Sequence, residues 1–171
     1  MEYWDIYDDK GKTTGRINAE KGSLAPGEHH LAIEAWLWHP EGYFLIQKRG
    51  MSRSTFAGRW AHTTGRVQAG EDSLRGCLRE IKEELGISLS EEEPLLVKRV
   101  MKTGTPLIWD IFVVKRAIQV SELVLDSTEV DSVRFVTPVE LLTIMQSGRF
   151  VDYPEIREIY DAVMEQLMMQ N

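Results

Sequence analysis

The sequence predicts an α/β fold in a single domain, and two observations lead to that class. Segments rich in β-branched and aromatic residues recur on both sides of one amphipathic helix. The chain has 171 residues, 43% of them hydrophobic, which is enough for one well-filled core within the usual size of a domain. We therefore expect one domain, residues 1–171, in which a sheet packs against helices.

The first part of the chain predicts three strands and a long loop. Residues 2–8 alternate enough to form a strand, and the Asp and Gly residues after them favour the turn of a short hairpin extension over 1–26. A strand at 30–38 is joined by a tight turn to a strand at 43–48. Residues 49–70 are too punctuated for regular structure and too aromatic for a disordered linker, so we expect a functional loop.

The clearest helix is predicted over residues 72–85. Gly86 follows it at the position where a left-handed cap is favoured. Two strands are expected next, at 95–101 and 107–115, because β-branched and aromatic residues dominate there around a turn. A further short strand is expected at 133–136, so the sheet continues beyond the helix.

Two more helices are predicted near the C-terminus. Pro138 opens a helix from 139 to about 145, since proline is tolerated in the first turn. The segment 154–169 predicts the other helix through apolar residues at helical spacing. These residues are Ile156, Ile159, Val163 and Leu167.

Charge and cysteine content exclude several classes of protein. The 27 acidic and 20 basic residues give a net charge of -7, which argues against a surface that wraps nucleic acid. The single cysteine, Cys77, cannot form an internal disulfide, and the acidic, aromatic N-terminus does not resemble a signal peptide. No apolar run approaches the roughly 20 residues of a membrane span. We expect a cytoplasmic protein without membrane or nucleic-acid partners.

One face of the predicted helix collects carboxylates. At 100° per residue, Glu84 lies about 40° from Glu80, and Glu83 lies about 60° away on the other side. Like charges at this spacing repel one another, so a cation is expected nearby. Arg79 stands four residues before Glu83 and can pair with it. Glu80 and Glu84 are then free to bind a hard divalent ion such as magnesium, which prefers oxygen ligands.

The spacing around these glutamates resembles the box that marks the Nudix hydrolase family. An acidic triplet alone is typical of a solvated surface helix. Here, however, every fixed position of the Nudix box is matched, and similarity extends from about His30 to Leu141. The matching residues are Gly65, Glu71, Arg79, Glu80, Ile81, Glu83, Glu84, Gly86 and Ile87.

The resemblance implies a Nudix-type α/β/α sandwich with a mixed β-sheet, in which the box binds Mg²⁺ or Mn²⁺. By this analogy Glu80 and Glu84 are metal ligands, and the carbonyl of Gly65 is a further ligand. Glu83 would be a third ligand or a partner of the ligands, and Arg79 would orient it. Such metals neutralise a diphosphate and lower the pKa of a bound water that attacks phosphorus.

The general base is expected either in the box, at Glu83, or on a later loop, because members of the family differ in this respect. In this chain the later loop falls in the acidic stretch between residues 122 and 131. We favour Glu129 there, because the strand after it should return towards the sheet, although a solvated charge run fits equally well. The alternatives within that stretch are Glu122, Asp126 and Asp131.

Two arginines precede the box in a segment that looks like the strand and approach loop of many Nudix proteins. Arg49 and Arg53 are therefore expected to contact substrate phosphates, for which the acidic chain offers few other cations. A plain surface role is the alternative for each of them.

Three segments are similar to isopentenyl diphosphate isomerase and to hydrolases that resemble it: WDIYDDKGKTTGRI, HLAIEAWLW and WAHTTGRVQAGE. The isomerase uses a cysteine just before the box glycine and a histidine just after it. Here these positions hold Thr64 and Arg66, and a threonine hydroxyl is a poor substitute for a thiolate. We therefore expect hydrolysis of a pyrophosphate bond in a small molecule, a nucleoside diphosphate linked to another moiety.

Two alternatives from other classes stay open. An isomerase-like enzyme would use His29, His30 and His62 as a second metal site, as the isomerase does. A noncatalytic Nudix module that senses a nucleotide would have lost catalytic glutamates, which this chain retains. The N-terminal hairpin suits either a cover over the site or a contact within a homodimer. Its aromatic residues are Tyr3, Trp4 and Tyr7.

Overall fold

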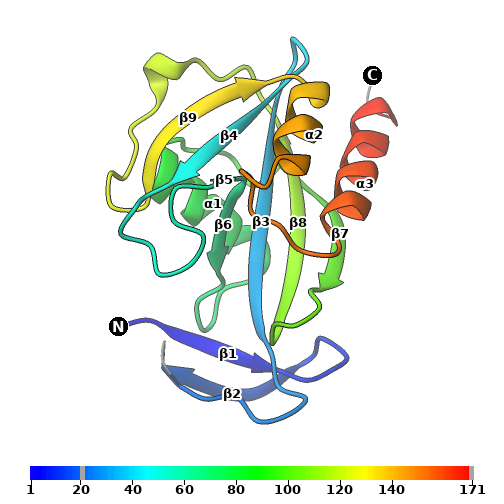
Figure 1. Ribbon diagram of the computed structural model, residues 1–171. Helices are drawn as coiled ribbons and strands as arrows, with labels where there is room; N and C mark the ends of the chain where they lie inside the picture. Colours follow the sequence, from blue (N-terminus) through cyan, green and yellow to red (C-terminus); the bar gives the residue numbers. More distant parts are fainter. Residues whose placement is uncertain (20–21, 170–171) are drawn as a thin grey trace.

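A mixed β-sheet lies between two layers of helix in the computed structural model, which describes residues 1–19 and 22–169 (Figure 1). The helices are α1 (Ser73–Leu85), α2 (Pro138–Gln146) and α3 (Ile156–Met169), and a short 3₁₀ turn, η1, spans Val120–Glu122. The strands of this sheet are β3 (His30–His39), β4 (Tyr43–Arg49), β5 (Trp60–Ala61), β6 (Thr63–Arg66), β7 (Pro94–Met101), β8 (Leu107–Lys115) and β9 (Val130–Val136).

The sheet has the order β5-β4-β3-β8-β7, with β6 also paired to β3 and β9 also paired to β4. The pair β3 and β8 is parallel, in a register that runs from His30 opposite Leu107 to Trp38 opposite Lys115. The other pairs are antiparallel. The mixed sheet between α1 on one face and α2 with α3 on the other confirms the predicted α/β/α sandwich.

Alternation along β3 separates the two cores. Ile33 and Leu37 pack with Ile81 of α1 in one apolar cluster. Trp36, whose side chain points to the opposite face, packs with residues of α2 and α3 in the other cluster. Because β3 is buried on both faces, its side chains fix the positions of α1 and of the C-terminal helices together.

Helix α1 begins and ends as its sequence predicts. The side chain of Asp72, the N-cap, accepts a hydrogen bond from the backbone N–H of Arg75 at 2.8 Å. Gly86 has a φ of 76°, which is the left-handed conformation that favours glycine at the C-terminal end of a helix. These two caps set the length of the helix that carries Glu80, Glu83 and Glu84.

The predicted loop 49–70 contains regular structure, so this prediction was wrong in part. Strands β5 and β6 lie within it, paired to β4 and β3. Both are too short for an alternating pattern, and β6 contains a glycine, so only the pairing with β3 and β4 makes them strands. The strand predicted at 133–136 likewise begins earlier, at Val130, where it pairs with Arg49.

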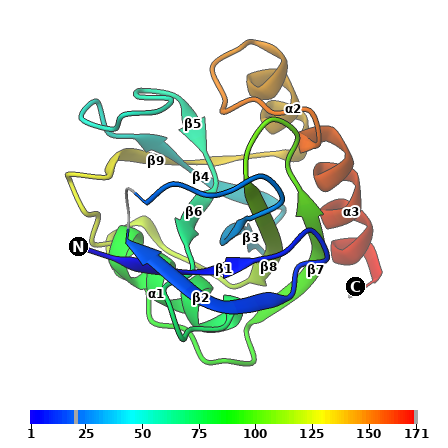
Figure 2. The same cartoon turned by 90° about the horizontal axis from the view of Figure 1, so that it is seen from below.

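The N-terminal hairpin forms a separate two-stranded sheet. Its strands, β1 (Tyr3–Tyr7) and β2 (Thr13–Ala19), cross the end of the main sheet at which β3 and β8 begin (Figures 1 and 2). Tyr7 and His29 exchange backbone hydrogen bonds of 2.8 and 2.9 Å, which tie the hairpin to β3. Residues 20 and 21 of the predicted 1–26 hairpin lie outside the described residues, and the division of the chain into domain and extension stays a prediction.

Over the described ranges, 1–19 and 22–169, no helix is both long enough and apolar enough to span a membrane.

Candidate active site

Glu84 is buried in a network that joins three elements. Its side chain has an exposed fraction of 3%, although it lies on the carboxylate face of α1. The Nε2 of Gln47, on β4, donates a hydrogen bond of 2.5 Å to Glu84 Oε2. The Oγ1 of Thr63, on β6, donates in turn to Gln47 Oε1 at 2.9 Å. Helix and sheet therefore hold this carboxylate in one orientation.

Glu80 lies against the backbone of Gly65. A Cβ atom at position 65 would stand 1.8 Å from the carboxyl carbon of Glu80, a distance that two nonbonded atoms cannot have. One oxygen of Glu80 also accepts a hydrogen bond of 2.7 Å from Arg79 Nη1. Only glycine fits at position 65, and the carboxylate and the backbone of β6 are adjacent for this reason.

Arg79 connects the box helix to the loop before it. Its Nε and Nη2 donate hydrogen bonds of 2.9 and 3.0 Å to the two carboxylate oxygens of Glu71. Nη2 also donates to the carbonyl of Arg66 at 2.8 Å, and Nη1 donates to Glu83 at 3.1 Å. The sequence predicts the pair with Glu83, but it does not identify the two-pronged pair with Glu71, which is the better formed of the two.

The buried glutamates are hard to ionise in this structure. Burial raises the pKa of Glu80 to about 7, and the negative charges of Glu83 and Glu129 add to the effect against the opposing Arg79. Burial also raises the pKa of Glu84 to about 8, with Glu80 and Glu129 adding to it and Gln47 opposing it. A divalent cation beside these carboxylates would stabilise their ionised forms.

The donor set fits a hard divalent ion such as Mg²⁺ or Mn²⁺. Glu80 and Glu84 offer carboxylate oxygens, and Gly65 brings a backbone carbonyl close to Glu80 because it lacks a Cβ. As the side chains lie, residues 1–19 and 22–169 contain no group of three or more His, Cys, Asp or Glu arranged to hold a metal. Glu83 is largely exposed and contacts Arg79 instead.

The loop that carries Glu129 is fastened beside the box. The backbone N–H of Asp126 donates to the carbonyl of Glu84 at 3.1 Å, and that of Gly50 donates to the carbonyl of Glu129 at 2.8 Å. The charge of Glu129 contributes to the pKa of both Glu80 and Glu84, so its carboxylate lies near theirs.

The other acidic residues of that stretch have local partners. Asp126 accepts hydrogen bonds from the backbone and hydroxyl of Thr128, at 2.9 and 2.7 Å. Asp131 pairs with Lys48 at 3.6 Å, and Glu122 accepts a bond from the N–H of the residue that begins its own turn. Of the four predicted acids, Glu129 is the one whose charge acts on both buried box glutamates.

Both predicted arginines lie beside these acids. Arg53 Nη1 is 2.8 Å from Glu129 Oε1. Arg49 donates from Nε to the carbonyl of Thr55 at 3.1 Å, and the charges of Glu84 and Glu129 act on its guanidinium. The cations that the acidic chain otherwise lacks are therefore near the carboxylates of the box.

The three histidines do not come together. His62 stacks on Trp36 at 3.7 Å between ring centres and is 2% exposed, so burial lowers its pKa to about 4. His29 contacts Asp9, and His30 contacts Arg66. A second metal site of the isomerase type is absent from these three side chains.

Cys77 cannot replace the thiolate that the isomerase chemistry needs. Its side chain is buried in the core beneath α1, and this burial raises the pKa of the thiol to about 12. A thiol with this pKa stays protonated at neutral pH and is a weak nucleophile.

Sequence reasoning missed polar residues buried inside apolar strands. Gln47 is one of them. Glu34 on β3 is another, and it accepts hydrogen bonds from Lys102 at 2.8 Å and from the hydroxyl of Tyr153 at 2.6 Å on the sheet face opposite α1. The available signal was a single polar residue within an otherwise apolar run, as in FLIQK and LAIEAWL.

The fold and the box together define a Nudix protein, and comparison with known proteins agrees. Residues 28–159 match the NUDIX domain family, and the chain belongs to that family. An uncharacterized Nudix hydrolase of Listeria monocytogenes is 32% identical over 163 residues, which cover 94% of this chain and 95% of that protein.

The other similarities are narrower or concern the fold alone. An isopentenyl-diphosphate Delta-isomerase of Escherichia coli is 29% identical over 87 residues, which cover 50% of this chain and 48% of the isomerase. A crystal structure of a protein from Deinococcus radiodurans superimposes with a TM-score of 0.78 at 18% identity, over 94% of this chain and 98% of that one.

Proposed function

We propose that this Nudix protein is a Mg²⁺- or Mn²⁺-dependent hydrolase that cleaves the pyrophosphate bond of a nucleoside diphosphate linked to another moiety. The observation that carries the proposal is the pair of buried carboxylates, Glu80 and Glu84, beside the backbone of Gly65. Two carboxylates that burial makes hard to ionise form a site in need of a cation, and a diphosphate brings further negative charge to it.

Glu80, Glu84 and the carbonyl of Gly65 would hold the metal, which neutralises the diphosphate and acidifies a water when it is bound. Glu83 is the candidate third ligand. In the structure Arg79 already contacts Glu80 and Glu83 from one side, so its part is to orient both carboxylates. None of these residues needs to move between elements to act.

Glu129 is our candidate for the general base, with Glu83 as the alternative. Its carboxylate is near those of Glu80 and Glu84, and it can accept the proton of an attacking water on that side. Arg53 now holds Glu129, and Arg49 lies beside it. A substrate phosphate that draws Arg53 away would free the base, so binding and activation of the water would be coupled.

A panel of diphosphates tests the proposal. Purified protein with Mg²⁺ or Mn²⁺ is incubated with nucleotides, nucleotide sugars and prenyl diphosphates, and released phosphate products and isomerised prenyl products are both measured. We expect metal-dependent hydrolysis of at least one nucleoside diphosphate derivative and no isomerisation. Absence of metal-dependent turnover across the whole panel would leave only the noncatalytic sensor.

Glu84→Gln separates catalysis from folding. Loss of a metal ligand should lower turnover by more than about 100-fold, since even groups that only support a ligand account for about 10–100-fold. The fold should survive, because a neutral amide replaces a carboxylate that is hard to ionise. Glu92→Gln, a change of the same charge at an exposed position, should turn over like the parent. Equal turnover of Glu84→Gln and the parent would contradict the proposal.

A further inference from the structure

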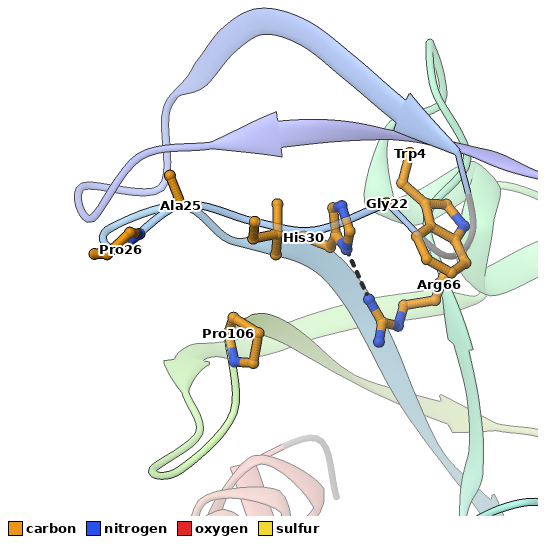
Figure 3. Close-up of a pocket in the computed structure, with 8 residues that line it drawn as sticks. Trp4, Gly22, Ala25, Pro26, His30, Arg66 and Pro106 are labelled. Carbon is orange, nitrogen blue, oxygen red and sulfur yellow. Dashed lines mark hydrogen bonds between the residues drawn. The ribbon is translucent and has the colours of Figure 1, made fainter.

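A pocket lies between the N-terminal hairpin and the end of the sheet at which β3 and β8 begin (Figure 3). Its volume is about 460 Å³, within the range of sites that bind small molecules. Leu24, Ala25, Pro26 and Pro106 form an apolar part of its wall. Arg66 enters from β6, one residue after Gly65, so its side chain points to the strand face opposite the one on which Glu80 lies.

Arg66 carries a charge that no acidic group of the described residues balances. Its Nη1 donates a hydrogen bond of 2.9 Å to His30 Nδ1, and its guanidinium lies 4.7 Å from the ring centre of Trp4. Burial lowers its pKa, and no charged partner offsets that effect. A partly buried guanidinium with unused donors is costly unless an acceptor reaches it.

His30 adds no negative charge. Because a guanidinium can only donate, Nδ1 of His30 must be the acceptor in that contact. The proton of the ring is then on Nε2, which faces Asn18 Oδ1 at 2.7 Å. Burial and the charge of Arg66 lower the pKa of His30 to about 4, so the ring is neutral at neutral pH.

The nearest carboxylate is already engaged. Glu28 influences the pKa of His30, but its two oxygens accept hydrogen bonds from Arg16 and from the backbone N–H of Ala25. Figure 3 shows the guanidinium of Arg66 directed towards the space between His30 and Pro106. The pocket therefore joins one cation to an apolar wall.

We infer that this pocket binds a small organic anion, a phosphate or carboxylate group joined to a short apolar body. The planar guanidinium suits either group because its parallel N–H bonds match two oxygens. The apolar wall would receive the remainder of the ligand. The anion is either the far end of a substrate whose diphosphate lies at α1 or a separate small molecule.

Binding is tested with phenyl phosphate against phenol, which has the same ring without the charge. In ¹⁵N-labelled protein, the indole signal of Trp4, assigned with Trp4→Phe, and the Nε signal of Arg66 report on the pocket. We expect both signals to shift with millimolar phenyl phosphate and not with phenol. No shift with phenyl phosphate, or equal shifts with both compounds, would overturn the inference.

Arg66→Gln distinguishes a binding residue from a structural one. It should weaken phenyl phosphate at least tenfold and leave the melting temperature unchanged or higher, because no ion pair is lost. Arg75→Gln removes the same charge from an exposed position of α1 and should bind like the parent. Undiminished binding by Arg66→Gln, or a lowered melting temperature without weaker binding, would refute the assignment.

The source of the anion is read from turnover with the diphosphate found in the panel. Competition between phenyl phosphate and that substrate would support the far end of the substrate as the occupant. Binding of both together would support a separate molecule. Because the spectroscopic test needs no turnover, a failed panel with intact binding would refute the hydrolase and leave the anion pocket standing.

Discussion

Gly65 is the residue at which the candidate site tolerates least change. Its hydrogen occupies space that any Cβ would share with the carboxyl group of Glu80. Its backbone conformation is within reach of other residues, since it is not among the glycines with positive φ. Contact with Glu80, rather than backbone freedom, therefore requires glycine at this position.

Gly65→Ala should displace the Glu80 carboxylate and lower kcat by about 100-fold, the loss that a displacement of about 1 Å can cause. Steady-state kinetics with Mg²⁺ on the best substrate of the panel measures this. Thr64→Ala, a change at the neighbouring residue, whose side chain points to the other face of β6, is the matched control and should keep parental turnover. Similar kinetics for Gly65→Ala and the parent would exclude Glu80 from the metal site.

Among the elements, β4, β6 and α1 meet at a single side chain. Gln47 donates to Glu84 and accepts from Thr63, so its amide transmits the position of the sheet to the helix. A buried ligand that is supported in this way stays aligned when no metal is present.

Gln47→Met keeps the size of the side chain and removes both hydrogen bonds. We expect kcat to fall by about 10–100-fold, as for other groups that support a metal ligand. Stability should also fall, by about 1–3 kcal/mol, because the buried Thr63 hydroxyl loses its acceptor. Urea unfolding and kinetics together measure the two effects. Gln146→Met, an exposed position of α2, should change neither, and parental kcat in Gln47→Met would contradict the supporting role.

The elements show what could be predicted from the sequence. Helix α1 follows from its caps and its apolar stripe, and the spacing of the box is sufficient to identify Gly65 and Glu80. Gln47 could not be assigned, because its role depends on contacts with residues far apart in the chain. Strand β6 was missed for the same reason, since pairing with β3 rather than local preference creates it.

At the scale of the whole molecule, the two buried glutamates couple stability to pH. Their pKa values in the folded chain, about 7 for Glu80 and about 8 for Glu84, are above the value near 4.3 of an unperturbed glutamate. The folded chain therefore binds more protons than the unfolded one. Their contribution to stability is complete below about pH 4 and is lost as the pH rises through about 7 and 8.

We expect the melting temperature of the metal-free protein to fall between pH 7 and pH 9, by at least about 2–4 °C, which corresponds to roughly 1 kcal/mol in a chain of this size. Mg²⁺ should raise it more at pH 9 than at pH 7, because the metal competes with protons for the carboxylates. The histidines with lowered pKa, His30 and His62, titrate below this range.

Differential scanning fluorimetry with EDTA or with Mg²⁺ measures both curves. Glu84→Gln should flatten the metal-free curve, whereas Glu92→Gln should reproduce the parent. A metal-free melting temperature that rises from pH 7 to pH 9, or a Mg²⁺ effect that is equal at both values, would show that these two carboxylates do not control stability.

The parallel pair of β3 and β8 also constrains how the chain is made. One long edge of β3 has no partner until Lys115 has left the ribosome, by which time the whole of α1 has been synthesised. A nascent chain that stops earlier would present an open strand edge with the apolar side chains of Leu31 and Ile33. The nascent protein should therefore depend on chaperones most strongly between the synthesis of α1 and the completion of β8.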